Sequence, residues 1–176
     1  MSAMNEIWLT VVSEFSDIAD IKEATVILLR LGLAVVLGAA IGYEREMKGK
    51  DAGLRTHMLV SLGAAIFVLV PVSSGMQISD MSRVMQGVIA GVGFLGAGAI
   101  LKQENDHVVK GLTTAASIWI AAAIGVAAGY GRESTAVAST LIALFVLAVV
   151  NRFDKSKSKH VVPVASDTDH RSSSGL

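Results

Sequence analysis

The sequence contains no cysteine, two prolines, two tryptophans, two tyrosines and few charged residues. The absence of cysteine excludes disulfides, thiolate metal ligands and a cysteine nucleophile. The scarcity of proline argues against a collagen-like or proline-rich disordered chain. Charged residues make up 17% of the 176 residues, whereas ordinary soluble domains carry about 25%. Fifteen cationic side chains balance fifteen acidic ones, so the chain lacks the net basic charge that draws proteins to nucleic acid.

The residues that replace the missing charges are apolar or small. Hydrophobic residues account for 52% of the chain, 17 glycines are added to them, and the mean hydropathy is +0.59. A bilayer is crossed by about 20 apolar residues in a helix, and five stretches approach this length. They are Ala24–Tyr43, His57–Ser74, Val84–Leu101, Gly111–Tyr130 and Ser134–Val150. The sequence therefore predicts an all-α, polytopic membrane bundle of five transmembrane helices, in which short connections make consecutive helices antiparallel neighbours.

The two ends of the chain differ from the apolar middle. In residues 1–23, apolar side chains such as Trp8 recur at helical spacing among five acids, which favours an amphipathic helix at the membrane interface over a frayed terminus. Residues 151–176 turn polar and basic, as expected of a tail that contacts anionic lipid. We therefore divide the chain into an interfacial segment 1–23, a transmembrane domain 24–150 and a polar tail 151–176.

The distribution of cations sets the expected orientation. With the N-terminus outside, the inner segments carry eleven Lys and Arg residues and the outer segments carry three. Lysine and arginine in short loops stay on the cytoplasmic side. The sequence predicts a multi-pass membrane protein whose N-terminus lies outside and whose C-terminus is cytoplasmic.

A shift of 58 residues overlays two parts of the chain. Gly53-Leu54-x-Thr56 matches Gly111-Leu112-x-Thr114, and Glu46 matches Glu104. Both Gly-Leu-x-Thr motifs fall where an inner loop enters the next helix. We interpret the first and second spans as a unit repeated, in the same orientation, by the third and fourth.

Glycines are spaced to serve helix packing. Gly91 to Gly96 spells the GxGxxG of a nucleotide-binding fold, but that motif requires a strand before it and a helix after it. Because lipid tails are as apolar as leucine, membrane helices associate by close approach at small residues. The alternative is a break in the helix that starts at Val84, as at transporter sites. The glycines assigned to packing are Gly38, Gly42, Gly87, Gly91, Gly93, Gly96, Gly98, Gly125 and Gly129.

Arg30 is the one charge inside a predicted span. It either snorkels to the outer headgroups or is buried, in which case it becomes a functional candidate. Asp80 and Glu133, from the outer loops, are its possible partners.

A second group of charges lies at the inner end of the first span. Glu44, Arg45, Glu46 and Arg55 are close in sequence, and an ion-pair cluster explains them better than a Mg²⁺ site, although carboxylates are ligands that Mg²⁺ accepts. We expect no metal and no cofactor. Thr56 and Thr114 sit where they can cap helices, and Glu44 or Glu104 are expected to dock at those N-termini.

Four ordered motifs resemble the MgtC/SapB family. They are Gly38-x-x-x-Gly42-x-Glu44-Arg45-Glu46, Ala52-Gly53-Leu54-Arg55-Thr56-His57, Gly91-x-Gly93-Phe94-Leu95-Gly96-Ala97-Gly98 and Lys110-Gly111-Leu112-Thr113-Thr114-Ala115-Ala116-x-x-Trp119. The resemblance implies an inner-membrane protein with five spans, associated with growth under magnesium scarcity and with virulence. Longer members carry a soluble C-terminal domain, and we expect this sequence to supply the transmembrane domain alone.

Two functions remain open. The first is a non-enzymatic protein that modulates membrane energetics or other membrane complexes under low-magnesium or related stress, with lipid, further copies of itself and, by resemblance, the proton-driven ATP synthase as partners. The second is a transporter or channel for an ion, magnesium among the candidates. A membrane enzyme is set aside because the sequence shows no recognisable nucleophile or acid–base pair. The functional candidates are Arg30, Glu44, Arg45, Glu46, Arg55, Thr56, Glu104, Thr113 and Thr114.

Overall fold

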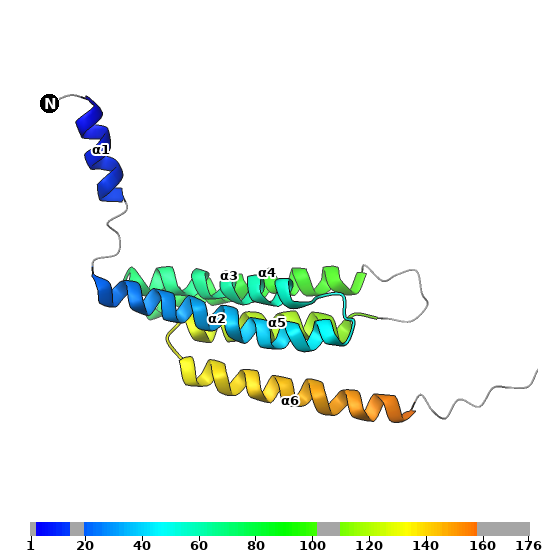
Figure 1. The fold of residues 1–176 in the computed structure, drawn as a ribbon. Helices are drawn as coiled ribbons and strands as arrows, with labels where there is room; N and C mark the ends of the chain where they lie inside the picture. Colours follow the sequence, from blue (N-terminus) through cyan, green and yellow to red (C-terminus); the bar gives the residue numbers. More distant parts are fainter. Residues whose placement is uncertain (1–2, 15–19, 102–109, 158–176) are drawn as a thin grey trace, which may run out of the picture. The chain divides into compact units, whose positions relative to one another are not determined.

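The computed structural model describes residues 3–14, 20–101 and 110–157. All regular structure in these ranges is helical, as the sequence predicts (Figure 1). The helices are α1 (Ala3–Glu14), α2 (Ile21–Met47), α3 (Leu54–Ser73), α4 (Ile78–Leu101), α5 (Leu112–Gly129) and α6 (Glu133–Lys157). The chain forms two compact units, residues 1–144 and 145–176, and the bundle of α2 to α5 lies in the first.

Local signals explain where α2 begins and ends. The carboxylate of Asp20 caps the helix by accepting the backbone N–H of Glu23 at 2.7 Å, which satisfies one of the free donors of the first turn. Beyond Met47 the backbone of Gly49 has φ +61°, a left-handed conformation that glycine adopts readily. The helix thus extends past the predicted span 24–43 at both ends, because an apolar run stops at the first charge and a helix does not.

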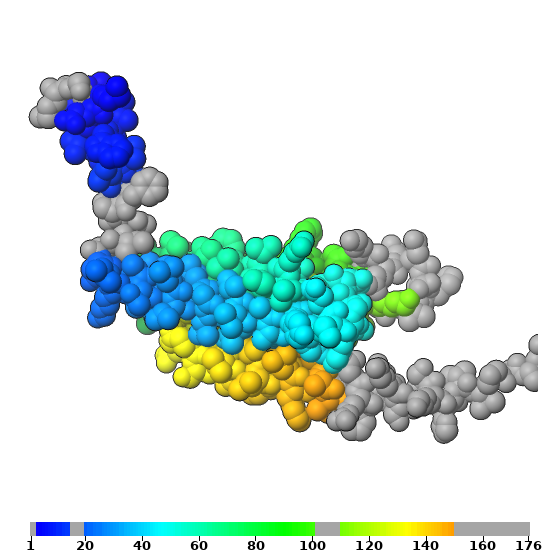
Figure 2. Space-filling model, in the orientation of Figure 1, coloured from blue at the N-terminus to red at the C-terminus, as the bar shows by residue number. Residues whose placement is uncertain are grey.

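The central helix of the bundle is α3. It packs against α2 on one side and α5 on another, and it also contacts α4; α5 in turn contacts α2 and α4. The four helices run side by side in Figure 1, and Figure 2 shows the side chains of α2 and α3 in contact on one face. Short connections between α2, α3 and α4 make these consecutive helices antiparallel neighbours, as the sequence predicts.

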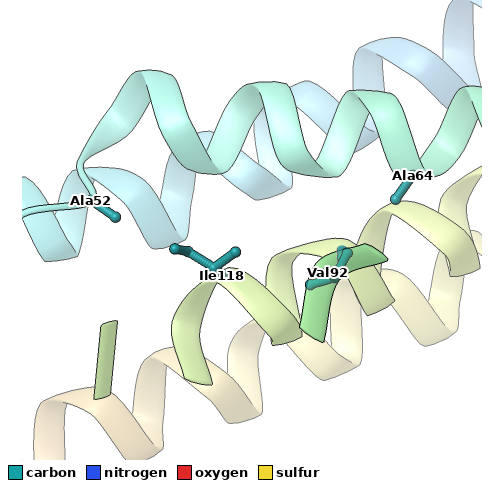
Figure 3. Close-up of a cluster of buried hydrophobic side chains, with 5 residues drawn as sticks. Ala52, Ala64, Val92 and Ile118 are labelled. Carbon is teal, nitrogen blue, oxygen red and sulfur yellow. The ribbon is translucent and has the colours of Figure 1, made fainter. Parts of the chain in front are cut away.

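Small and β-branched side chains fill the core between these helices. One cluster joins Ala52, from the α2–α3 connection, to Ala64 of α3, Val92 of α4 and Ile118 of α5 (Figure 3). Small side chains allow the helix backbones to approach closely, which is how helices associate in lipid.

Four helices are long and apolar enough to cross a membrane, namely α2, α3, α4 and α5. The apolar part of α6, Glu133–Val149, is shorter than these, so the fifth span remains a prediction. The helix itself continues to Lys157 and does not end at the predicted boundary of the tail. The helix α1 forms where periodicity predicts one, with exposed side chains throughout, and its location at the membrane interface remains a prediction.

Candidate functional site

A buried arginine lies at the C-terminal end of α2. The side chain of Arg45 is 1% exposed, and its Nη1 lies 3.8 Å from Oε2 of Glu44. The other carboxylate oxygen of Glu44 is ion-paired with Nζ of Lys48, one helical turn along. In the described part of the chain, Nε and Nη2 of Arg45 are buried without a hydrogen-bond partner. A buried charge whose donors lack partners lowers the stability of the folded protein. Arg45 is therefore a candidate for a functional role rather than a stabilising one.

The next carboxylate caps α3. Oε2 of Glu46 accepts the backbone N–H of Leu54 at 2.8 Å, so α2 supplies an acceptor to the first turn of its neighbour. The N-cap residues of α3 and α5 are Gly53 and Gly111, which have no side chain that could cap their own helix. The prediction that Thr56 and Thr114 cap these helices is therefore wrong, because the N-cap positions lie three residues earlier and each threonine is already inside the first turn.

The prediction for the acid at this N-terminus also needs correction. The carboxylate that docks there is Glu46, whereas Glu44 pairs with Arg45 and Lys48. Successive residues on a helix point about 100° apart, so neighbouring carboxylates at the end of α2 face different partners. Glu104 lies outside the described residues.

A histidine joins α3 to α5 beside this cluster. The imidazole of His57 is fully buried; its Nδ1 lies 2.8 Å from the carbonyl oxygen of Gly53 and its Nε2 lies 3.0 Å from Oγ of Ser117. Oγ of Ser117 also lies 2.8 Å from the carbonyl oxygen of Thr114. Sequence reasoning did not find this pair. A signal in the sequence could have identified Ser117. It is a polar residue inside an apolar span, and such residues often form hydrogen bonds between helices.

Arg30 connects the other end of α2 to the α5–α6 connection. Its Nε lies 3.5 Å from Oε1 of Glu133, with side-chain exposures of 22% and 52%. Its Nη1 donates to the carbonyl oxygen of Gly129 at 3.5 Å. Gly131 has φ +82°, and a Cβ there would collide with the guanidinium. Of the two acids considered from the sequence, Glu133 is the partner in this structure.

The remaining sequence candidates do not join these groups. Arg55, Thr56 and Thr113 are exposed. The described residues contain no group of three His, Cys, Asp or Glu side chains placed to hold a metal ion. The polar residues that the structure brings together are Glu44 and Arg45 at the end of α2, Lys48 just beyond it, and the imidazole and hydroxyl of His57 and Ser117 between α3 and α5.

The glycines fall into two groups, and the first is tightly packed against α3. A Cβ on Gly38 would lie 2.6 Å from the carbonyl oxygen of His57, and one on Gly42 would lie 2.7 Å from Cα of Leu54. On α5, Cβ atoms on Gly125 and Gly129 would collide with the backbone of α3. These four glycines allow α2 and α5 to approach α3 at backbone distance.

The second group lies on α4 and faces open space. Among the described residues, no neighbouring atom lies within 4 Å of a Cβ built on Gly87, Gly91, Gly93 or Gly98, and Gly96 makes one ordinary contact, with Ala115. These glycines do not mediate packing between the described helices of this chain. The break considered for this helix is also absent, since α4 is continuous from Ile78 to Leu101.

An apolar groove runs between α3 and α4 beside the open glycines. Its volume is about 630 Å³, and Gly63 from α3 and Gly87 and Gly91 from α4 are in its lining. The other lining residues are aliphatic or aromatic: Leu59, Val60, Ala64, Phe67, Val84, Val88, Val92 and Leu95. In a membrane, such a groove is open to lipid or to another apolar helix.

Comparison with known proteins places these features in a family. The model of the MgtC family matches residues 31–156. Protein SrpB of Synechococcus elongatus is 44% identical over 137 residues, which cover 72% of this chain and 75% of SrpB. Protein MgtC of Salmonella paratyphi A is 38% identical over 146 residues, covering 82% of this chain and 60% of that protein. No solved structure matches the chain.

A further relative is YhiD of Escherichia coli K12, whose name proposes magnesium transport. It is 42% identical over 132 residues, 71% of this chain and 60% of YhiD. The chain therefore spans about three fifths of the length of YhiD and of MgtC. The family match begins within α2 and covers α3, α4, α5 and most of α6, and with them the polar cluster at the end of α2 and the glycines of both groups. This multi-pass membrane protein belongs to the MgtC family.

Proposed function

We propose that this chain is a non-enzymatic protein of the bacterial inner membrane that modulates membrane energetics or another membrane complex under low-magnesium or related stress. The observation that carries the proposal is the contrast between the two groups of glycines. Four are in contact with backbone inside the bundle, and four on α4 are open. Open glycines beside an apolar groove suit the docking of a partner helix.

The partner in this proposal is a transmembrane helix, either of another copy of the chain or of a membrane complex. The proton-driven ATP synthase is a candidate complex on family resemblance. The excess of cations in the inner segments supports a cytoplasmic C-terminus and an external N-terminus. Phe94 of α4 is 81% exposed, which supports α4 as a helix that receives partners.

The experiment fills the groove without changing the bundle. Gly91→Leu places a large side chain in the groove, and Gly32→Leu is the matched control because Gly32 is an open glycine of α2 away from it. Affinity purification from native membranes should recover the partner complex with the wild type and with Gly32→Leu, and lose it with Gly91→Leu. Thermal unfolding in detergent verifies that both variants fold. Equal recovery with both variants would contradict the proposal.

Ion transport is the second candidate function, and the buried charges at the end of α2 favour it. Arg45 and Glu44 are charged groups inside a candidate span, and such groups often mark ion pathways. Reconstituted protein would then carry an ion flux, for magnesium or another ion, that Glu44→Gln abolishes and Gly91→Leu leaves intact. Glu6→Gln on α1, a carboxylate outside the cluster, is the control. A flux of this kind would displace the first proposal.

A further inference from the structure

Both ring nitrogens of His57 face groups that accept hydrogen bonds. Nδ1 lies 2.8 Å from the carbonyl oxygen of Gly53, and Nε2 lies 3.0 Å from the hydroxyl of Ser117. That hydroxyl is also 2.8 Å from the carbonyl oxygen of Thr114. A carbonyl oxygen accepts and never donates, so Nδ1 must carry a hydrogen; a hydroxyl has a single hydrogen to donate.

Two arrangements of hydrogens fit these contacts. In the neutral imidazole, Nδ1 donates to the carbonyl of Gly53, and Nε2 accepts the hydrogen of the Ser117 hydroxyl, so the carbonyl of Thr114 loses that donor. In the imidazolium, both nitrogens donate and the hydroxyl turns to the carbonyl of Thr114. The three contacts are hydrogen bonds at the same time only in the protonated form.

The position of His57 prevents water from relieving this conflict. The imidazole is fully buried, and its own backbone carbonyl lies against Gly38 of α2 at a distance that excludes a side chain. Four residues along α3, the backbone of Ser61 is in similarly close contact with Gly125 of α5. The ring is therefore fixed where α2, α3 and α5 meet.

The charged groups around the ring come from α2. Burial disfavours a charge on the imidazole, and Arg45 and Glu44 act on it electrostatically in opposite directions. On α3 the cation Arg55 is exposed, and α5 faces the ring with the Ser117 hydroxyl. A proton on His57 is therefore coupled to the ion pairs of Glu44 with Arg45 and Lys48.

We propose that His57 and Ser117 form a proton-binding switch between α3 and α5. One proton from the solution binds Nε2 of His57, and the Ser117 hydroxyl, which keeps its own hydrogen, turns from His57 to the carbonyl of Thr114. Loss of the proton restores the bond from Ser117 to His57. The switch does not depend on which of the two functions above is correct.

The test is ¹⁵N NMR of the full chain, with labelled histidine, in lipid nanodiscs between pH 5 and 8.5. The chain has four histidines, and the signal that disappears in His57→Asn identifies His57. We expect a neutral form with its hydrogen on Nδ1 at high pH and an imidazolium at low pH. A neutral form with its hydrogen on Nε2, or a ring that stays neutral throughout, would overturn the proposal without any need of a variant.

Variants of the hydroxyl test the coupling. At the pH where wild-type His57 is half protonated, Ser117→Ala should lower the ratio of imidazolium to neutral ring about tenfold, because a hydrogen bond to a charged group is roughly twice as strong as a neutral one. Ser117→Thr keeps the hydroxyl and should stay within about twofold of the wild type. Ser61→Ala is the control, because the buried Ser61 hydroxyl has no hydrogen-bond partner among the described residues and its loss should leave the ratio unchanged. Identical ratios in Ser117→Ala and wild type would refute the switch.

Discussion

Replacing one glycine by alanine should lower the stability of the protein when the glycine is on α5 and raise it when the glycine is on α4. A Cβ on Gly125 would collide with the carbonyl oxygen, carbonyl carbon and Cα of Ser61, whereas a Cβ on Gly91 would meet no atom within 4 Å. Overpacking typically costs about 1–3 kcal/mol, and a contact with backbone belongs at the upper end because backbone cannot rotate away. Alanine gains about 1 kcal/mol over glycine in helix propensity. Gly125→Ala should therefore destabilise the protein by about 2 kcal/mol, whereas Gly91→Ala should stabilise it by up to about 1 kcal/mol.

The difference between the two variants, about 3 kcal/mol, corresponds to roughly a hundredfold change in the folding equilibrium. Unfolding by titration with a denaturing detergent, followed by circular dichroism in mixed micelles, measures it directly. Thermal unfolding should show Gly125→Ala about 4–8 °C below the wild type. Gly129→Ala and Gly87→Ala repeat the comparison one turn away on the same two helices. If Gly125→Ala and Gly91→Ala proved equally stable, the division of the glycines into packed and open groups would be wrong.

Three further predictions concern the ends of α2. Glu46→Ala should cost about 1 kcal/mol, because the N–H of Leu54 loses its acceptor, whereas Glu46→Gln should cost less in the same unfolding assay; equal losses would exclude capping. Arg45→Met and Arg45→Ala should both lower stability, because each removes one partner of the Glu44 carboxylate, and alanine should cost about 1–2 kcal/mol more than methionine because it also leaves a cavity; equal losses with the two variants would contradict the reasoning. Lys50→Cys, in a chain without other cysteines, should react in intact cells only with a membrane-permeable maleimide, whereas Ile78→Cys, at an 82% exposed position after α3, should also react with an impermeable one; the opposite pattern would reverse the topology.

The sequence was sufficient to predict the helices but not their ends. Apolar runs identified α2 to α5, because length and hydropathy are properties of each segment alone. The ends lay elsewhere because capping groups decide them: Asp20 extends α2 at its start, and Glu46 on α2 supplies the acceptor for the start of α3. That second acceptor comes from another helix, so no local pattern contains it. The internal repeat predicts the relation between two helix starts correctly. Helices α3 and α5 begin at Leu54 and Leu112, which are 58 residues apart.

The candidate site could be predicted only in part, because its contacts also join different helices and no local pattern contains them. Charge inside an apolar run drew attention to Arg30 and to the end of α2, but the partner of His57 depends on how α3 and α5 are rotated against each other. The same limit applies to the glycines. Gly38 with Gly42 and Gly87 with Gly91 have the same four-residue spacing, yet the first pair is packed and the second is open. The four-residue spacing of glycines shows that another helix can approach closely, whereas the packing of the bundle shows which helix does so.

The contact of glycines from two helices with the backbone of α3 constrains how this protein can move. Gly38 and Gly42 from α2, and Gly125 and Gly129 from α5, leave no compressible side chain between the backbones. Sliding or rotation of α3 would drive main-chain atoms into one another, so α2, α3 and α5 are expected to travel as a rigid body. Among α2 to α5, displacement of α4 is the motion that contacts between glycine and backbone oppose least, because the glycines of α4 make no such contact with the described residues.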